Sequence, residues 1–271
     1  GDINGDGIAD LAVGANNASI GGRSRAGATY LKFGPIGAEV DLPGGADIVI
    51  TGADERFESG TSLAIADVDA DGSPDLLVGS QRGSATNSKP NAGVSNVLLG
   101  PLGPGRLDLA TVGGVLIQGV ASRDESGSAL AFGDVSGDGV ADLLVGASQS
   151  LEFRKGTLHV VLGPLGSEPI DLESQTDITI VGSEQTTVQA FARFTITVTG
   201  GVGTAVAVAD LNGDGQLDVA VSAENGDVGD GEDAGHTYVF FGPLQTGSMD
   251  ATTADVTITG QGMRARAGSS I

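Results

Sequence analysis

Short apolar runs of five to eight residues, each bounded by glycine or by polar residues, recur along the whole chain. One set of four covers residues 60–66, 75–79, 93–100 and 114–119. Runs of this length that are rich in Val, Ile and Thr are typical of β-strands. The sequence lacks apolar residues at the sustained spacing of about 3.6 that indicates amphipathic helices. The pattern therefore predicts an all-β protein with few helices.

The apolar runs group into four repeats of four strands each. The loop between the first and second strand of a repeat starts at an aspartate, and these aspartates are 65, 67 and 76 positions apart. Repeats of four short strands are typical of propeller blades, so we predict a β-propeller with four-stranded antiparallel blades. The predicted repeats are 1–52, 53–119, 120–182 and 183–260, within a single β-propeller segment, 1–271.

The two ends of the sequence leave two arrangements open. The first repeat lacks its first strand, whereas residues 261–271 resemble the start of one. These residues either close a ring of four blades by pairing beside residues 8–14, or form the first strand of a further blade. The chain starts at Gly1-Asp2, without a Met or a signal peptide, so we expect the four repeats to belong to a larger propeller.

Each repeat carries an aspartate-rich loop between its first and second strands. Oxygen-bearing side chains stand at loop positions 1, 3, 5 and 9, and a glycine at position 6 lets the chain turn sharply. Hard oxygen ligands in a flexible loop suit Ca²⁺, and the carbonyl at position 7 completes the set, so we predict up to four Ca²⁺ ions. The predicted side-chain ligands are Asp2, Asn4, Asp6 and Asp10; Asp67, Asp69, Asp71 and Asp75; Asp134, Ser136, Asp138 and Asp142; and Asp210, Asn212, Asp214 and Asp218. The predicted carbonyl ligands are those of Ile8, Ser73, Val140 and Gln216.

Two other kinds of structure contain similar loops. Asp-Gly pairs occur in plain β-hairpin turns, but four copies that each have an aspartate at position 9 favour metal binding. An EF-hand loop needs a glutamate at position 12 and flanking helices. Position 12 is a valine in every repeat, at Val13, Val78, Val145 and Val221, which excludes an EF-hand.

The composition narrows the class of protein further. The 271 residues include 46 Gly and no Cys, and 35 acidic residues outnumber 13 Lys and Arg, for a formal charge of −22. A chain without cysteine has neither a disulfide framework nor a thiolate metal site. So acidic a chain is not suited to nucleic acid, and no apolar run reaches the roughly 18 residues of a membrane span. We expect neither a nucleic-acid partner nor a membrane-spanning segment.

The acidic residues are expected to gather on one face of the propeller. In a blade of antiparallel strands, the aspartate-rich loops and the connections between third and fourth strands lie at the same end. The thirteen loop aspartates would then share this face with ten more acids, among them Asp108, Asp171, Glu173 and Asp250. The opposite face should carry most of the basic residues and a mixed charge.

The repeats resemble the FG-GAP repeats of integrin α-subunit propellers and their bacterial relatives. Besides the loops, the resemblance rests on Phe132-Gly133, Val13-Gly14-Ala15, Val145-Gly146-Ala147 and the Phe-Gly-Pro runs at 33–35 and 241–243. It covers essentially the whole chain. It implies Ca²⁺ loops on the lower face of a propeller, usually of seven blades, and a ligand on the opposite face. The chain departs from the family pattern at Ile65-Ala66, Val208-Ala209 and Ser222-Ala223, and in having four repeats.

The sequence shows no arrangement of residues that predicts catalysis. Both histidines, His159 and His236, fall in third strands, and neither a nucleophile–base spacing nor a phosphate-binding loop is visible. We expect a chain without enzyme activity, acting as an extracellular or cell-surface binding or adhesion scaffold for a protein or glycan ligand. The alternative is the propeller domain of a secreted hydrolase or lyase whose catalytic residues lie outside this chain. Residues 186–198, in the longest connection between blades, form either a binding element or an added hairpin.

Overall fold

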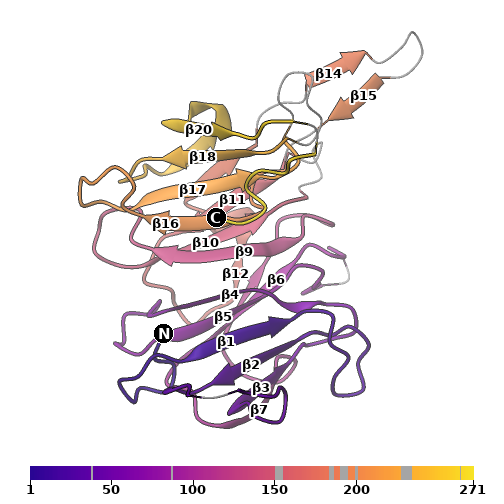
Figure 1. Ribbon diagram of the computed structural model, residues 1–271, viewed down its shortest axis with the longest axis vertical. Helices are drawn as coiled ribbons and strands as arrows, with labels where there is room; N and C mark the ends of the chain where they lie inside the picture. Colours follow the sequence, from indigo (N-terminus) through magenta and orange to yellow (C-terminus); the bar gives the residue numbers. More distant parts are fainter. Residues whose placement is uncertain are drawn as a thin grey trace.

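The short apolar runs form strands in the computed structural model, which describes every residue except 38, 87, 150–154, 183–185, 190–194, 199–200, 227–233 and 263. The strands build four blades that follow one another along the longest axis of the molecule (Figure 1). Within the described residues, helix is restricted to α1 (Leu172–Gln175) and the 3-10 turn η1 (Ala251–Thr253). The predicted all-β fold, a partial β-propeller, is confirmed.

Each blade is a sheet whose main strands pair antiparallel with their neighbours. The first blade begins with the strand that follows its aspartate-rich loop, and the others have all four strands of the predicted repeat. The first blade holds β1 (Leu11–Ala15), β2 (Ala28–Lys32) and β3 (Ile48–Thr51). The second holds β4 (Ser59–Ala66), β5 (Asp75–Ser80), β6 (Val94–Leu98) and β8 (Val115–Gln118). The third holds β9 (Ser126–Gly133), β10 (Asp142–Ala147), β11 (Thr157–Val161) and β13 (Ile178–Val181). The fourth holds β16 (Val206–Ala209), β17 (Asp218–Ala223), β18 (His236–Phe240) and β20 (Val256–Thr259).

The long connection between the third and fourth blades contains an added hairpin. β14 (Thr186–Gln189) and β15 (Thr195–Val198) pair antiparallel and form a sheet of their own. The sequence allows two interpretations of residues 186–198, and an added hairpin is one of them. The other interpretation, a binding element, stays a prediction, and residues 183–185, 190–194 and 199–200 of this connection lie outside the described residues.

Three blades gain an outer strand from the following repeat, a strand that the sequence pattern did not predict. We call it the fifth strand, from its place in a complete blade; in the first blade, which lacks the first strand of its repeat, it is the fourth strand of the sheet. β7 (Gly105–Asp108) follows the third strand of the second blade and pairs in parallel with β3, the fourth strand of the first blade. β12 (Ile170–Asp171) and β19 (Gly247–Asp250) pair in the same way with β8 and β13. Each connection between a third and a fourth strand therefore completes the sheet of the preceding blade, across the predicted repeat limits at 52, 119 and 182.

The first of these fifth strands carries an acid away from the aspartate-rich loops. Asp108 stands at the far end of β7, level with Thr51 at the end of β3. Both carboxylate oxygens of Asp108 accept hydrogen bonds from the Arg23 guanidinium, each at 2.9 Å. The hydrogen bonds from Arg23 lower the pKa of the Asp108 carboxyl. This ion pair links β7, which belongs to the second repeat, to the first blade on the face opposite the aspartate-rich loops.

The other fifth strands place acids on the same opposite face. Lys89 lies 3.5 Å from a carboxylate oxygen of Asp171 and 2.8 Å from one of Glu173. Asp250 is level with Val181, at the far end of β13. The prediction that Asp108, Asp171, Glu173 and Asp250 share the face of the aspartate-rich loops is therefore wrong, because the connection runs along the preceding blade before it returns.

The apolar core lies between the blades. Alternate residues of a strand point to opposite faces of a sheet. In β5, Leu76 and Val78 belong to the cluster shared with the first blade, and Leu77 belongs to the cluster shared with the third. Three such clusters of buried residues result, one at each boundary between successive blades. The second and third blades are therefore held in place chiefly by burying both faces against their neighbours, and the first and fourth blades by burying one face each.

Residues 264–268 make a backbone hydrogen bond to the fourth blade like the one that the start of β4 makes to the first blade. The N–H of Ala267 donates to the carbonyl of Ala234 at 2.9 Å, as the N–H of Ser59 donates to Ala26 at 2.9 Å. Within the described residues, no backbone pairing joins 264–271 to 8–14. The ring-closing alternative finds no support in the described part of the chain, and the further blade stays a prediction.

Candidate metal loops

The four aspartate-rich loops share one backbone arrangement, which is organised by the aspartate at position 1. In the first loop, Asp2 Oδ1 accepts a hydrogen bond from the N–H of Asp6 at 3.0 Å, and Oδ2 accepts one from Gly7 at 2.7 Å. Gly7 has a φ of 87°, a conformation that glycine adopts without strain. The first aspartates of the other loops accept the equivalent pair of hydrogen bonds: Asp67, Asp134 and Asp210. Each loop therefore wraps around its first carboxylate.

Positions 3, 5 and 7 continue this turn. Asn4 Oδ1 accepts from the N–H of Asp6 at 2.9 Å, and Asp6 Oδ1 accepts from the N–H of Ile8 at 2.8 Å. The bond from position 7 to position 5 recurs in the other loops, with the N–H groups of Ser73, Val140 and Gln216 as donors. The backbone thus fixes the carboxylate at position 5, while the carbonyls at position 7 stay predicted ligands.

The aspartate at position 9 joins the loop to the end of the third strand of its blade. Asp75 is 1% exposed, and its Oδ2 accepts the N–H of Val68 at 2.9 Å while its Oδ1 accepts the N–H of Gly100 at 2.8 Å. Asp10, Asp142 and Asp218 make the same two bonds in their blades. The glycine donors, which the sequence analysis missed, are Gly34, Gly100, Gly163 and Gly242. The Gly-Pro that follows every third strand is the sequence signal that marks them.

Burial raises the pKa of the Asp75 and Asp142 carboxyls, because it disfavours their charged form. For Asp75, the N–H groups of Val68 and Gly100 lower the pKa, while the charges of Asp69 and Asp71 raise it. A cation in the loop would favour the ionised form of all these carboxyls. A bound cation would therefore stabilise the ionised carboxylates of the loop.

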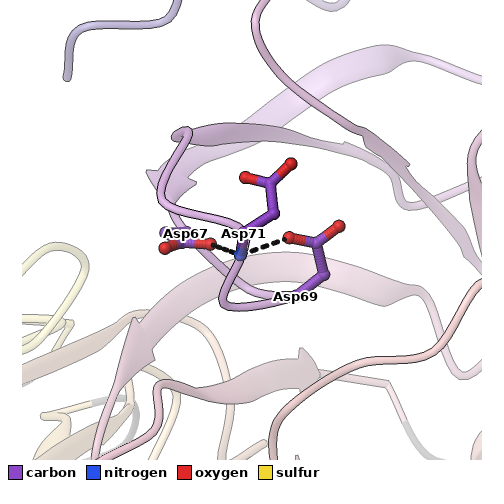
Figure 2. A group of neighbouring side chains, drawn as sticks. All are labelled: Asp67, Asp69 and Asp71. Carbon is purple, nitrogen blue, oxygen red and sulfur yellow. Dashed lines mark hydrogen bonds between the residues drawn. The ribbon is translucent and has the colours of Figure 1, made fainter.

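The second loop brings three carboxylates together. Asp67, Asp69 and Asp71 each place an oxygen within 4.8 Å of the others. Figure 2 shows Asp67 and Asp69 on either side of the Asp71 amide, with both side chains accepting its N–H at 3.1 Å. Asp75 is not a member of this group. The first, third and fourth loops have Asn4, Ser136 and Asn212 at position 3, and so have one carboxylate fewer.

The donor set fits calcium. Every predicted side-chain ligand offers a hard oxygen, which is what Ca²⁺ takes, in flexible geometry with six to eight ligands. A carboxylate oxygen that accepts one hydrogen bond keeps a further lone pair for a cation. The hydrogen bonds at positions 1, 5 and 9 are therefore compatible with metal binding, and the twenty predicted ligands stay a prediction.

The two histidines lie in third strands, as expected. His159 in β11 is buried, with Nδ1 3.3 Å from Thr176 Oγ1. His236 in β18 stacks on Tyr238, with ring centroids 5.6 Å apart. Both positions are those of residues that contribute to packing within a blade.

Repeated blades, each with an aspartate-rich loop directly before the second strand of its repeat, define a repeat protein of the propeller class. The family model described as FG-GAP repeat matches residues 1–31, 59–96, 126–161 and 202–240, which together make up more than half of the chain. The chain therefore belongs to the FG-GAP repeat family, and the resemblance found in the sequence is confirmed.

Curated relatives include enzymes. The chain is 31% identical over 150 residues to phosphatidylinositol-glycan-specific phospholipase D from Bos taurus and 33% identical over 150 residues to the protein from Rattus norvegicus. The protein of that name from Dictyostelium discoideum is 27% identical over 177 residues. These matches cover 53–59% of this chain but span only 17–18% of the length of the relatives. Within the described residues, no helix is long and apolar enough to cross a membrane.

Proposed function

We propose that this chain is a calcium-binding FG-GAP propeller segment that acts as an extracellular or cell-surface binding and adhesion scaffold, without enzyme activity of its own. The observation that carries the proposal is the fourfold repetition of one loop geometry, with a first carboxylate wrapped by backbone N–H groups and a second one held at position 9. Calcium sites of extracellular modules work at millimolar calcium, where weak loops fill. A scaffold of this kind leaves its other loops available for recognition.

The face opposite the aspartate-rich loops is the proposed ligand face. Arg25 and Arg82 both pair with the carboxylate of Glu58, which is buried, while the two arginine side chains are 48% and 45% exposed. The face thus offers charged donors on fixed positions, which suits hydrogen bonding to a protein or a glycan.

The alternative function is supported by the relatives. Their printed name is that of a phospholipase, and the matched segment is a small part of each enzyme. In this alternative, the chain is the propeller domain of a secreted hydrolase or lyase, and the catalytic residues lie outside it.

Three measurements test the proposal. Calorimetry should show up to four bound Ca²⁺ ions and weaker binding of Mg²⁺, and a chain that binds no Ca²⁺ would refute the calcium part. The chain alone should leave phosphatidylinositol-glycan intact, and cleavage would refute the non-enzyme part.

On a glycan and protein array, the double variant Arg25→Ala/Arg82→Ala should lose the binding that the unchanged chain shows. The variant Arg106→Ala, at the outer edge of the first blade, should keep that binding. Binding that survives the double variant would refute the assigned face.

A further inference from the structure

Two arginines occupy the same place at successive blade boundaries, on the face opposite the aspartate-rich loops. Arg56 stands shortly before β4 and Arg123 shortly before β9, and each of these strands runs toward the loop that follows it. The Ser62 hydroxyl of β4 donates to the Gly127 carbonyl of β9 at 2.6 Å, so the two strands are neighbours. The two arginines therefore stand at neighbouring positions on the proposed ligand face.

The backbone of both arginines adopts the left-handed conformation. Arg56 has a φ of 62° and Arg123 one of 69°, and Arg264, in the same place after the fourth blade, has one of 58°. The N–H of Arg56 donates to the Ser24 carbonyl at 2.9 Å, and that of Arg123 donates to the Pro90 carbonyl at 3.0 Å. Residues with a side chain seldom adopt this conformation, whereas glycine does so without strain. The chain therefore has a long cationic side chain where the backbone conformation favours glycine.

Both arginines are exposed, and neither guanidinium pairs with an acid in the described part of the chain. Nearby acids bind backbone groups: Asp54 accepts the N–H of Glu55 at 2.7 Å, and Asp124 accepts that of Ala121 at 2.7 Å. Four other cations of this face do form ion pairs: Arg23, Arg25, Arg82 and Lys89. Because 35 acids outnumber 13 Lys and Arg in this chain, a guanidinium without an acid partner is unusual and is available to an anion from outside.

The described loops of this face lack the exposed apolar side chains of a protein-binding surface. The centre of a protein interface is usually formed by aromatic and apolar anchors. In the described part of the chain, the exposed large apolar side chains lie in or beside the aspartate-rich loops, in β1 and β20, or at residue 271: Ile8, Leu11, Ile36, Leu99, Leu211, Phe241, Val256, Ile258 and Ile271. Exposed guanidiniums without apolar neighbours favour a polar, anionic ligand over a protein surface.

We propose that Arg56 and Arg123 bind the sulfate or carboxylate groups of an anionic glycan, an inference that rests on the proposed ligand face and names the chemistry of its ligand. A guanidinium donates two parallel hydrogen bonds to two oxygens of one such group. The same backbone conformation at successive boundaries presents one guanidinium per boundary, which suits a polymer whose anionic groups repeat. The acids of the aspartate-rich loops lie beyond the eight residues of β4, about 26 Å away, and salt screens charges over about 8 Å.

Binding of the chain to four immobilised polymers tests the ligand class. Dextran sulfate carries sulfate groups and hyaluronate carries carboxylates, whereas unmodified dextran is a neutral glycan and polyglutamate is an acidic peptide. In Ca²⁺ and about 0.15 M NaCl, the chain should bind dextran sulfate or hyaluronate about tenfold or more tighter than either dextran or polyglutamate. The tighter of the two anionic glycans identifies the group that the arginines recognise.

Substitution by glycine separates binding from folding. The double variant Arg56→Gly/Arg123→Gly should weaken binding of that glycan by about tenfold or more, and each single variant by about threefold or more. Its melting temperature should equal or exceed that of the unchanged chain, because glycine suits the left-handed backbone. Arg106→Ala is the matched control for the single variants: it removes the same charge from an exposed arginine of β7, and it should change the affinity by less than about twofold.

The proposal would be overturned if the chain bound neither anionic glycan, or if the double glycine variant bound as tightly as the unchanged chain. A lower melting temperature of that variant would also overturn it, since the arginines would then have a structural role, and so would equal or tighter binding of polyglutamate. Suppose the array instead finds a ligand that Arg25→Ala/Arg82→Ala loses and the double glycine variant keeps. The proposed ligand face then stands and the anionic-glycan site alone is refuted, whereas an array without any bound ligand refutes the proposed function as well.

Discussion

The aspartate at position 9 has a structural task in addition to its predicted role as a ligand. The buried carboxylate of Asp142 accepts the N–H of Val135 at 2.9 Å and that of Gly163 at 3.0 Å, and so ties the loop to the end of β11. The sequence pattern located these aspartates because their spacing is regular. It did not reveal the second bond, because Gly163 lies 21 residues away along the chain.

At the residue scale, we predict that Asp71→Ala costs more calcium affinity than any other single change in the loops. The second loop has one carboxylate more than the others, and more ligand charge favours tighter Ca²⁺ binding. Loss of Asp71 should weaken the tightest site by about tenfold or more, which corresponds to about 1.4 kcal/mol. Calorimetry of Asp71→Ala beside the control Asp138→Ala measures this loss of affinity.

The third loop, which has Ser136 at position 3, should also release its ion first on chelation. Four sites of equal affinity would contradict both expectations.

A second prediction concerns His159. Burial lowers the pKa of its imidazole to about 4, while the unfolded chain has a value of about 6.5. The unfolded state therefore binds the proton more readily, and the stability contributed by the neutral ring is lost as the pH falls from about 6.5 toward 4. At pH 5 the loss, relative to pH 7, is about 2 kcal/mol.

Urea unfolding at pH 7 and pH 5 in saturating Ca²⁺ measures this loss. His159→Gln, which lacks a titrating ring, should show a smaller difference between the two pH values than the wild type does. His236→Gln is the control, because His236 lies in the corresponding strand of the next blade, two residues before the position equivalent to His159. Equal pH dependence in wild type and His159→Gln would show that another group is responsible.

At the scale of elements, the four main strands of each blade were predictable and the fifth was not. β5 and β10 are continuous apolar runs after an aspartate-rich loop, so local pattern is enough to find them. β7 has the sequence Gly-Arg-Leu-Asp and forms only because β3 of the preceding blade offers a free edge. The signal for it is the recurrence of an apolar-Asp pair at the same place in every repeat. Local strand propensity does not carry that information.

We predict that Asp108→Asn lowers the free energy of unfolding by about 0.5–1 kcal/mol. The change removes the charge that pairs with Arg23, and the bidentate pair is partly exposed, with side chains 28% and 38% accessible, which keeps its contribution small. Asp41→Asn is the matched control, because Asp41 holds the same place in the first repeat but is exposed. Urea unfolding at low protein concentration compares the two variants. Equal effects would show that the ion pair with Arg23 contributes nothing to the free energy of unfolding.

At the scale of the whole molecule, charge and metal are coupled. Each of four Ca²⁺ ions would add two positive charges, so the formal charge of −22 would fall to −14. Fewer like charges at close range mean less self-repulsion in the folded state.

We therefore predict that chelation strongly lowers the melting temperature. An ion that binds only the folded state adds about 2.7 kcal/mol per site at a hundredfold excess over its dissociation constant. Thermal unfolding with EGTA, followed by return of Ca²⁺ or Mg²⁺, measures the effect, and Ca²⁺ should restore the melting temperature better than Mg²⁺. A melt that thorough chelation leaves unchanged would rule out the metal as a stabilising ligand.

The fifth strands also bear on how the chain folds as the ribosome makes it. The sheet that starts at Leu11 ends at Asp108, the next runs from Ser59 to Asp171, and the third runs from Ser126 to Asp250. These stretches overlap, so a blade is still missing its outer strand when its own repeat has been synthesised. Each blade is completed only when the last part of the following repeat has emerged, so its folding lags behind its synthesis by most of a repeat.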